Sequence, residues 1–343
     1  MVRLRVRARL SFLLGRAGVS QAWLAARRLG RPRWLTVLNY HRVDQLEAAR
    51  DVDEGVLDAT PASLDRQLGR LRRHCTPIAL GDLLAHLDGA DLPPNPALVT
   101  FDDGYRDNLA TAAPILERHG IRGTFFIATN YVTERRVFWW DRISWTLKHA
   151  RRRHFRLDYP STLEVNLDAG TERPAWLLHR VVKTARLLDL ERFLDELVSR
   201  ADAPWEAATE RRLADRLIMT WDDVRALRRA GMDVGSHTRT HRVLQTLASG
   251  ELPAELAGSR RDLESELGEP VSAIAYPVGS SIAGEPEIRA AAVAAGYRLG
   301  FTYGGSLQPL GVVDPLDICR LAAEHTIDDA RFCTLLAAPW LAG

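Results

Sequence analysis

Short apolar runs alternate with longer segments of helical periodicity along most of the chain. Such runs are typical of strands buried on both faces of a parallel sheet. Predicted strands cover residues 34–43, 76–80, 97–101, 123–127, 232–235, 273–276, 299–302 and 318–321. Predicted helices cover residues 63–74, 81–87, 108–119, 222–230, 256–267, 287–295 and 328–337. This order predicts an α/β fold, either a parallel sheet or a (β/α) barrel.

Two segments depart from this strand and helix pattern. Residues 1–34 alternate Arg with Leu, Val and Ala, and form either an amphipathic helix for an anionic membrane surface or a solvated arm. Residues 143–216 have long helical patterns rich in Arg, Leu and Glu, which predict a helical insertion within one domain at residues 35–343. The aromatic run at 138–140 is either part of the core or a platform for a sugar ring.

Composition is ordinary for a globular protein of 343 residues, with 46% hydrophobic and 26% charged residues and a formal net charge of +2. The first 43 residues nevertheless hold ten arginines and no Asp, Glu or Lys. The three cysteines form no CxxC pair and suit a reducing compartment. No apolar run is long enough to span a bilayer. We therefore expect a cytoplasmic protein, peripheral at the inner face of the cytoplasmic membrane through its basic N-terminus.

Two adjacent carboxylates, Asp102 and Asp103, follow the strand predicted at 97–101. Enzymes of the α/β class keep their chemistry at this end of the strands. Neighbouring residues of a strand point to opposite faces, so the two acids can take different roles. The alternative is a simple Asp-Gly turn that ends the strand.

Two histidines, His237 and His241, lie four residues apart directly after another predicted strand. Two imidazoles at this spacing can face one cation. With one of the two aspartates they make three ligands and leave a coordination position open, as catalytic divalent metal sites require. The second aspartate can then act as a general base, and a further histidine can protonate the leaving nitrogen of an amide.

The stretches Thr100-Phe101-Asp102-Asp103-Gly104-Tyr105 and Ser236-His237-Thr238-Arg239-Thr240-His241 resemble two signature motifs of the polysaccharide deacetylases with a NodB-like domain (carbohydrate esterase family 4). The resemblance implies a distorted (β/α) barrel of about seven parallel strands. It implies that Asp102 is the general base. It also implies that Asp103, His237 and His241 hold a divalent metal, usually Zn²⁺ in this family.

The third family motif is altered in this chain. Residues 275–279 read Ala-Tyr-Pro-Val-Gly, so Ala275 stands where relatives carry an arginine that orients the base. By resemblance, the backbone N–H of Val278 would bind the oxyanion. Tyr276 and Tyr105 are further candidates for contact with the oxyanion or the substrate.

The catalytic acid is expected at His41. The stretch Asn39-Tyr40-His41-Arg42-Val43 resembles the first-strand motif of poly-N-acetylglucosamine deacetylases, whose strand order is permuted. His325 near the C-terminus is a weaker alternative. The remaining histidines, including His179, are predicted to lie on the surface of helices.

The resemblance implies a hydrolase that removes N-acetyl groups from amino sugars of a polysaccharide or a lipid-linked glycan. Exopolysaccharide or cell-envelope glycan biosynthesis is the expected setting. An alternative is a carbohydrate-binding relative that has lost turnover, which the missing arginine at Ala275 would favour. Nucleic-acid binding is not indicated, because the basic segment lacks interleaved aromatic residues and any known module pattern.

Overall fold

The computed structural model describes residues 11–30, 34–304 and 307–339. Seven parallel strands close into a barrel, in the spatial order β1, β13, β11, β10, β9, β6, β5 and back to β1. These are β1 (Trp34–Tyr40), β5 (Pro96–Phe101), β6 (Thr124–Ile127), β9 (Asp233–Ser236), β10 (Ala273–Ala275), β11 (Leu299–Tyr303) and β13 (Ile318–Ala322). The predicted distorted (β/α) barrel is confirmed.

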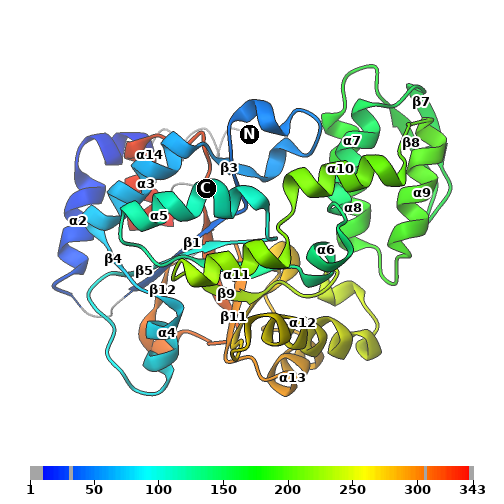
Figure 1. The fold of residues 1–343 in the computed structure, drawn as a ribbon. Coiled ribbons are helices and arrows are strands. Elements are labelled where there is room, and N and C mark those ends of the chain that lie inside the picture. The colour runs from blue at the N-terminus through cyan, green and yellow to red at the C-terminus, as the bar shows by residue number, and fades with distance from the viewer. Residues whose placement is uncertain (1–10, 31–33, 305–306, 340–343) are drawn as a thin grey trace.

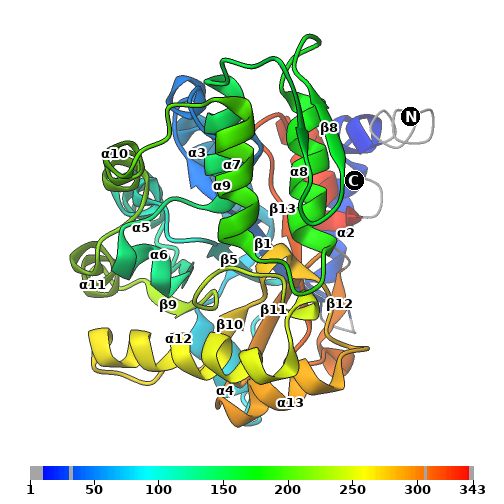
Figure 2. The same ribbon diagram turned by 90° about the vertical axis from the view of Figure 1, so that its right-hand side faces the viewer.

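Helices surround the barrel, as Figures 1 and 2 show. They are α3 (Pro61–His74), α4 (Leu80–Leu87), α5 (Ala113–Arg118), α11 (Trp221–Arg229), α12 (Leu252–Leu267), α13 (Pro286–Ala294) and α14 (Asp329–Ala337). The segment Asn108–Ala112 before α5 is π-helical, so the helix predicted at 108–119 has two different halves. Two short strands extend the sheet, β4 (Thr76–Pro77) beside β5 and β12 (Gln308–Pro309) antiparallel to β1.

Strand alternation decides which side chains fill the barrel. Leu35 and Val37 of β1, Leu98 of β5 and Phe301 of β11 belong to an interior apolar cluster that also includes residues of α4. The alternate residues pack outward against the helices in a larger cluster. Towards the carboxyl ends the interior becomes polar, because the next inward residues along these strands are polar. The site is built on this polar layer.

The predicted insertion contains more than helices. Between β6 and β9 the chain forms α6 (Thr129–Glu134), α7 (Trp139–Lys148), α8 (Glu172–Thr184), α9 (Leu190–Ala201) and α10 (Ala207–Leu217). It also forms an antiparallel hairpin of β7 (His154–Leu157) and β8 (Leu163–Asn166), which helical periodicity did not predict. In Figure 1 this segment lies on the right of the barrel, opposite α2 (Val19–Arg27).

The N-terminal segment is partly described. Residues 1–10 of the predicted basic arm lie outside the described residues. Residues 11–16 are helical, and α2 (Val19–Arg27) packs on α14. In the part of the chain that the structure covers, no helix combines the length and the apolar character needed to cross a bilayer.

Candidate active site

The two carboxylates of the opening motif lie at the carboxyl end of β5. The side chain of Asp102 continues the inward alternation of β5 into the polar layer of the barrel. Asp103 has a φ of 77° and Gly104 a φ of 91°, so the chain turns sharply directly after the strand. Both carboxylates are buried. The adjacent acids therefore occupy different surroundings.

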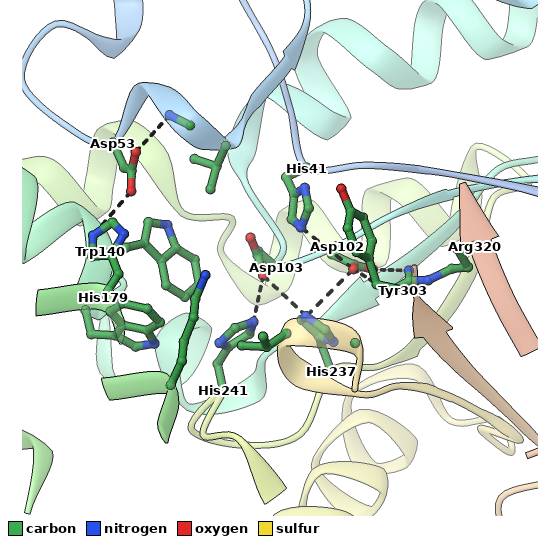
Figure 3. Close-up of a pocket in the computed structure, with 16 residues that line it drawn as sticks. His41, Asp53, Asp102, Asp103, Trp140, His179, His237, His241, Tyr303 and Arg320 are labelled. Atoms are coloured by element: carbon green, nitrogen blue, oxygen red, sulfur yellow. Dashed lines mark hydrogen bonds and ion pairs between the residues drawn. The ribbon is translucent and has the colours of Figure 1, made fainter. Parts of the chain in front are cut away.

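Asp103 faces both histidines of the second motif, which follow β9. The Nε2 atoms of His237 and His241 each lie 3.4 Å from Asp103 Oδ1. One ligand atom from each residue lies within 4.8 Å of the others (Figure 3). The three predicted ligands are thus brought together.

The donor set fits a divalent cation. Both carboxylate oxygens of Asp103 are buried without a hydrogen-bond partner among the described residues, and so is Nδ1 of His241. An uncompensated buried carboxylate is costly, and a bound cation would compensate it. His237 Nδ1 donates to the Ala275 carbonyl at 2.8 Å, which leaves its Nε2 lone pair free for a metal. Burial and neighbouring His237 lower the pKa of His241 to about 3, so its imidazole is neutral, as ligation requires.

Several residues at this site have an unfavourable backbone conformation. Of the eight described non-glycine residues with positive φ, four are Asp103, Thr238, His241 and Val278. A left-handed backbone is uncommon for non-glycine residues, and it is least favourable for the β-branched Thr238 and Val278. Strain of this kind costs about 1–3 kcal/mol per residue and persists where the surroundings impose it. The fold holds these side chains in a fixed arrangement.

An arginine from the last strand holds Asp102. Arg320 of β13 donates from Nη1 to Oδ1 at 2.7 Å and from Nη2 to Oδ2 at 2.8 Å (Figure 3). Asn39 of β1 also donates to Oδ2, at 3.2 Å. Burial alone would raise the pKa of Asp102, but the charges of Arg320, His237 and His41 outweigh it and hold the pKa well below its usual range. Asp102 is therefore ionised.

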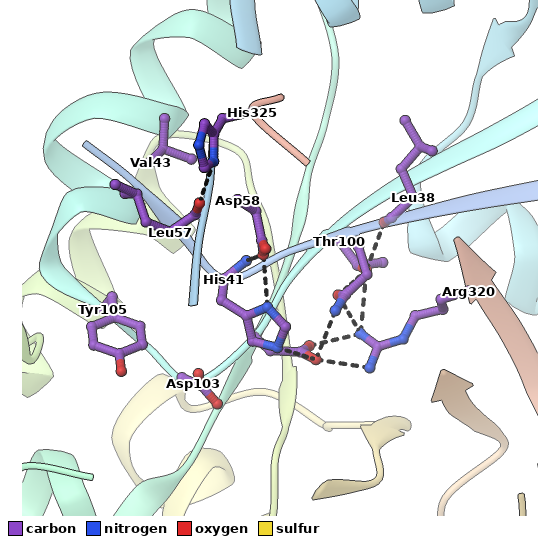
Figure 4. Close-up of polar contacts among 12 residues, drawn as sticks. Leu38, His41, Val43, Leu57, Asp58, Thr100, Asp103, Tyr105, Arg320 and His325 are labelled. Carbon is purple, nitrogen blue, oxygen red and sulfur yellow. Dashed lines mark hydrogen bonds and ion pairs between the residues drawn. The ribbon is translucent and has the colours of Figure 1, made fainter. Parts of the chain in front are cut away.

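His41 stands on the other side of Asp102. Its Nε2 lies 3.9 Å from Asp102 Oδ2, and the Nε2 of His237 lies 3.9 Å from the same oxygen. Its Nδ1 contacts Asp58 Oδ2 at 2.7 Å (Figure 4). Burial lowers the pKa of His41, but the charge of Asp58, its hydrogen bond and the more distant aspartates raise it to about 9. His41 is therefore protonated at neutral pH.

These groups line one end of a cavity of about 330 Å³. The insertion builds the other end, with Trp139 and Trp140 of α7 and His179 and Lys183 of α8. His179 Nε2 lies 3.5 Å from a carboxylate oxygen of Asp53 in the loop between β1 and α3. His179 is thus at the cavity rather than on the surface, contrary to the prediction. Segments far apart in the sequence enclose one space.

The other predicted residues are placed differently. Val278 lines the cavity with a φ of 61°. Tyr105 and Tyr276 are buried outside the lining: the hydroxyl of Tyr105 donates to Asp141 and that of Tyr276 to the Leu316 carbonyl. His325 contacts the Leu57 carbonyl and does not line the cavity.

Sequence reasoning missed Arg320 and Asp58. Arg320 had a signal, because it alternates with Ile318 in a predicted strand and so points a charge into the barrel. Asp58 had none beyond its place in a polar loop. Position 275 holds alanine, and Asp102 is instead contacted by a guanidinium from a different strand, that of Arg320 on β13.

The sequence matches the polysaccharide deacetylase family over residues 89–172 and 194–300, more than half of the chain. The protein belongs to this family, whose members hydrolyse N-acetyl amide bonds. A search of curated proteins found no match.

Solved structures of deacetylases share the fold. The deacetylase PplD of Streptococcus pyogenes, in complex with acetate, has a TM-score of 0.57 and 16% identity, with 90% of this chain and 100% of that chain covered. IcaB from Ammonifex degensii has a TM-score of 0.54 and 19% identity, with 91% and 98% covered. A de-N-acetylase from Aggregatibacter actinomycetemcomitans has a TM-score of 0.54 and 14% identity, with 87% and 98% covered.

Proposed function

We propose that the protein is a metal-dependent deacetylase that removes N-acetyl groups from amino sugars of a polysaccharide or a lipid-linked glycan. One observation carries the proposal. A buried Asp103 without a hydrogen-bond partner among the described residues faces two imidazole nitrogens, and directly beside this triad a second carboxylate, Asp102, is held ionised by Arg320. Membership of the polysaccharide deacetylase family supports the reaction type.

The protein's own residues divide the proton transfers between them. A divalent metal held by Asp103, His237 and His241, proposed to be Zn²⁺, would supply Lewis acidity that polarises the acetyl carbonyl and makes a water more acidic. Asp102 takes the proton of the attacking water as the new C–O bond forms. His41 gives its proton to the amide nitrogen as the C–N bond breaks. The products are acetate and a free amine.

The charges around the two groups suit these roles. Arg320 keeps Asp102 ionised and able to accept a proton, and Asp58 keeps His41 protonated and able to donate one. Two titratable groups whose surroundings push their pKa values apart are typical of an acid and base pair. The backbone N–H of Val278, at the strained turn in the cavity lining, is proposed to bind the oxyanion.

The insertion at 143–216 is proposed to bind the sugars that flank the reacting residue. Its α8 contributes His179 and Lys183 to the cavity, and the aromatic run at 138–140, just before the insertion, contributes two indole rings. Aromatic faces and polar side chains together are suited to a glycan. We place this activity in exopolysaccharide or envelope glycan biosynthesis, in the cytoplasm at the membrane.

The test is acetate release from N-acetylglucosamine oligosaccharides by the full chain loaded with zinc. We expect release by the wild type and none by Asp102→Asn, while both bind one zinc. A wild type that binds zinc and oligosaccharide but releases no more acetate than Asp102→Asn would instead indicate the binding relative. The ion pair of Arg320 with Asp102 disfavours that alternative, because the base retains an orienting arginine despite Ala275.

A further inference from the structure

Helix α2 buries two polar residues against the rest of the protein. Its buried residues are Ser20, Leu24 and Arg27. Ser20 Oγ lies 2.8 Å from Thr334 Oγ1, and Arg27 Nη1 donates to the Leu336 carbonyl at 2.9 Å. Both partners belong to α14. A surface helix normally buries an apolar stripe and exposes its polar residues, whereas α2 buries Ser20 and Arg27 beside Leu24.

The outward side of α2 is apolar. Val19, Ala22, Trp23 and Ala26 are exposed at spacings of three and four residues, which align them on one face of the helix. Val19 is 52% exposed, Trp23 is 53% exposed and Leu29, just beyond the helix, is 93% exposed. A contiguous exposed patch of this kind marks an interaction site. We call these five residues the α2 face.

The surroundings of the α2 face are cationic. The first acidic residue of the chain is Asp44, so nothing in the N-terminal segment offsets its arginines. Arg16 stacks near the exposed ring of Phe12, at 5.5 Å from its centroid. Arg28 donates to the Arg73 carbonyl at 3.2 Å, which brings the basic end of α3 beside α2.

We propose that the α2 face docks on the surface of an anionic lipid bilayer. An indole with aliphatic neighbours suits the boundary between headgroups and acyl chains, and the arginines around it suit anionic headgroups. A protein partner or a second copy would also cover apolar residues. The charge pattern favours lipid, because residues 1–43 supply arginines and contain no acidic residue. This inference does not depend on the deacetylase reaction.

Docking leaves the active site open. Arg27 Nη2 donates to the carbonyl of Trp34 at the start of β1, whereas His41 follows the end of that strand. A strand of this length separates its ends by about 20 Å. Figure 1 shows α2 and the insertion on opposite sides of the barrel. The membrane-bound protein would therefore still admit a glycan to its cavity.

Flotation of the full chain with vesicles tests the proposal. We expect binding to vesicles of phosphatidylcholine with phosphatidylglycerol, weakened by salt, and little binding to phosphatidylcholine alone. Trp23→Gln should reduce the partition coefficient about tenfold, the effect of losing one large buried apolar side chain. Trp176→Gln is the matched control, because Trp176 is 58% exposed on α8, and its partition should be unchanged.

Three results would overturn the proposal. Trp23→Gln could bind anionic vesicles as well as the wild type, which would assign binding to the arginines alone. Binding could be equally strong on neutral vesicles, which would remove the role of charge. Light scattering could show a dimer that Trp23→Gln dissociates, which would make the α2 face an interface between copies. Thermal unfolding of each variant checks that the exposed substitutions leave the fold intact.

Discussion

Replacing Arg320 by glutamine should shift the acidic limb of the pH profile of kcat/KM. Arg320 is the largest favourable influence on the ionised form of Asp102, and the side chains of both residues are almost fully buried, with 1% and 3% of their surface exposed. Glutamine retains hydrogen-bonding capacity but removes the positive charge. The carboxylate of Asp102 then remains buried in the barrel without the positive charge that stabilises its ionised form.

The expected magnitude follows from this burial. Removing one partner of a buried ion pair typically costs about 3–5 kcal/mol. One pKa unit corresponds to about 1.4 kcal/mol, so a penalty of about 3 kcal/mol is relieved by a rise of about 2 units in the pKa of Asp102. The general base must be unprotonated, so activity would begin at a correspondingly higher pH. Arg320→Lys, which keeps the charge but not the two parallel hydrogen bonds, should show a smaller shift.

The assay is acetate release across pH, together with urea unfolding of each variant. Arg142→Gln is the control, because Arg142 of α7 is also a buried arginine, donates to Asp195 at 2.6 Å and does not line the cavity. The Arg142→Gln variant should be less stable to urea, but the acidic limb of its kcat/KM profile should stay at the wild-type pH. A folded Arg320→Gln enzyme whose acidic limb stays at the wild-type pH would refute the assignment, since Arg320 would then be purely structural.

Three further predictions concern the other groups of the site. Asp58→Asn should move the alkaline limb of kcat/KM to lower pH, because His41 donates only when protonated and Asp58 is what raises its pKa to about 9; an unmoved limb would exclude His41 as the acid. Asp103→Asn should reduce zinc affinity by at least tenfold, measured by chelator competition. Thermal unfolding should show little loss, because the buried oxygens of Asp103 have no hydrogen-bond partner among the described residues. Lys183→Met should raise KM for a glycan bearing a carboxylate or phosphate more than for a neutral one. Lys148→Met is its control, because Lys148, the only other lysine, donates to backbone carbonyls and does not line the cavity; equal effects on both substrates would exclude charge recognition.

Local sequence was sufficient for the order of strands and helices and for the motif pairs, whereas the choice of a barrel came from the family resemblance. Asp102 and Asp103 end a strand, and His237 and His241 follow another, so parallel strands with a common direction had to bring them to one edge. Strand alternation and helical spacing are properties of neighbouring residues, and they can be recognised without knowing the fold. The family resemblance added the expected metal and the general base.

The insertion shows where periodicity is insufficient. Its helices were predicted, but the hairpin of β7 and β8 was not, because two four-residue strands carry too little pattern to outweigh the helical segments around them. Its contribution to the cavity was not predicted either. His179 and Lys183 look like ordinary polar residues of an amphipathic helix, and only the docking of α8 over the barrel turns them towards the site.

By itself the sequence determined the element order, the paired carboxylates and the paired histidines, because each rests on contacts a few residues apart. Only the tertiary structure decided that Arg320 holds Asp102 and that Asp58 holds His41. Asp102 and Arg320 are 218 residues apart in the sequence. They meet because the barrel closes with β5 and β13 on either side of β1. The same holds for α2, since an amphipathic pattern does not say which face is buried. There the hydrogen bonds of Ser20 and Arg27 with α14 turned the apolar face to the outside.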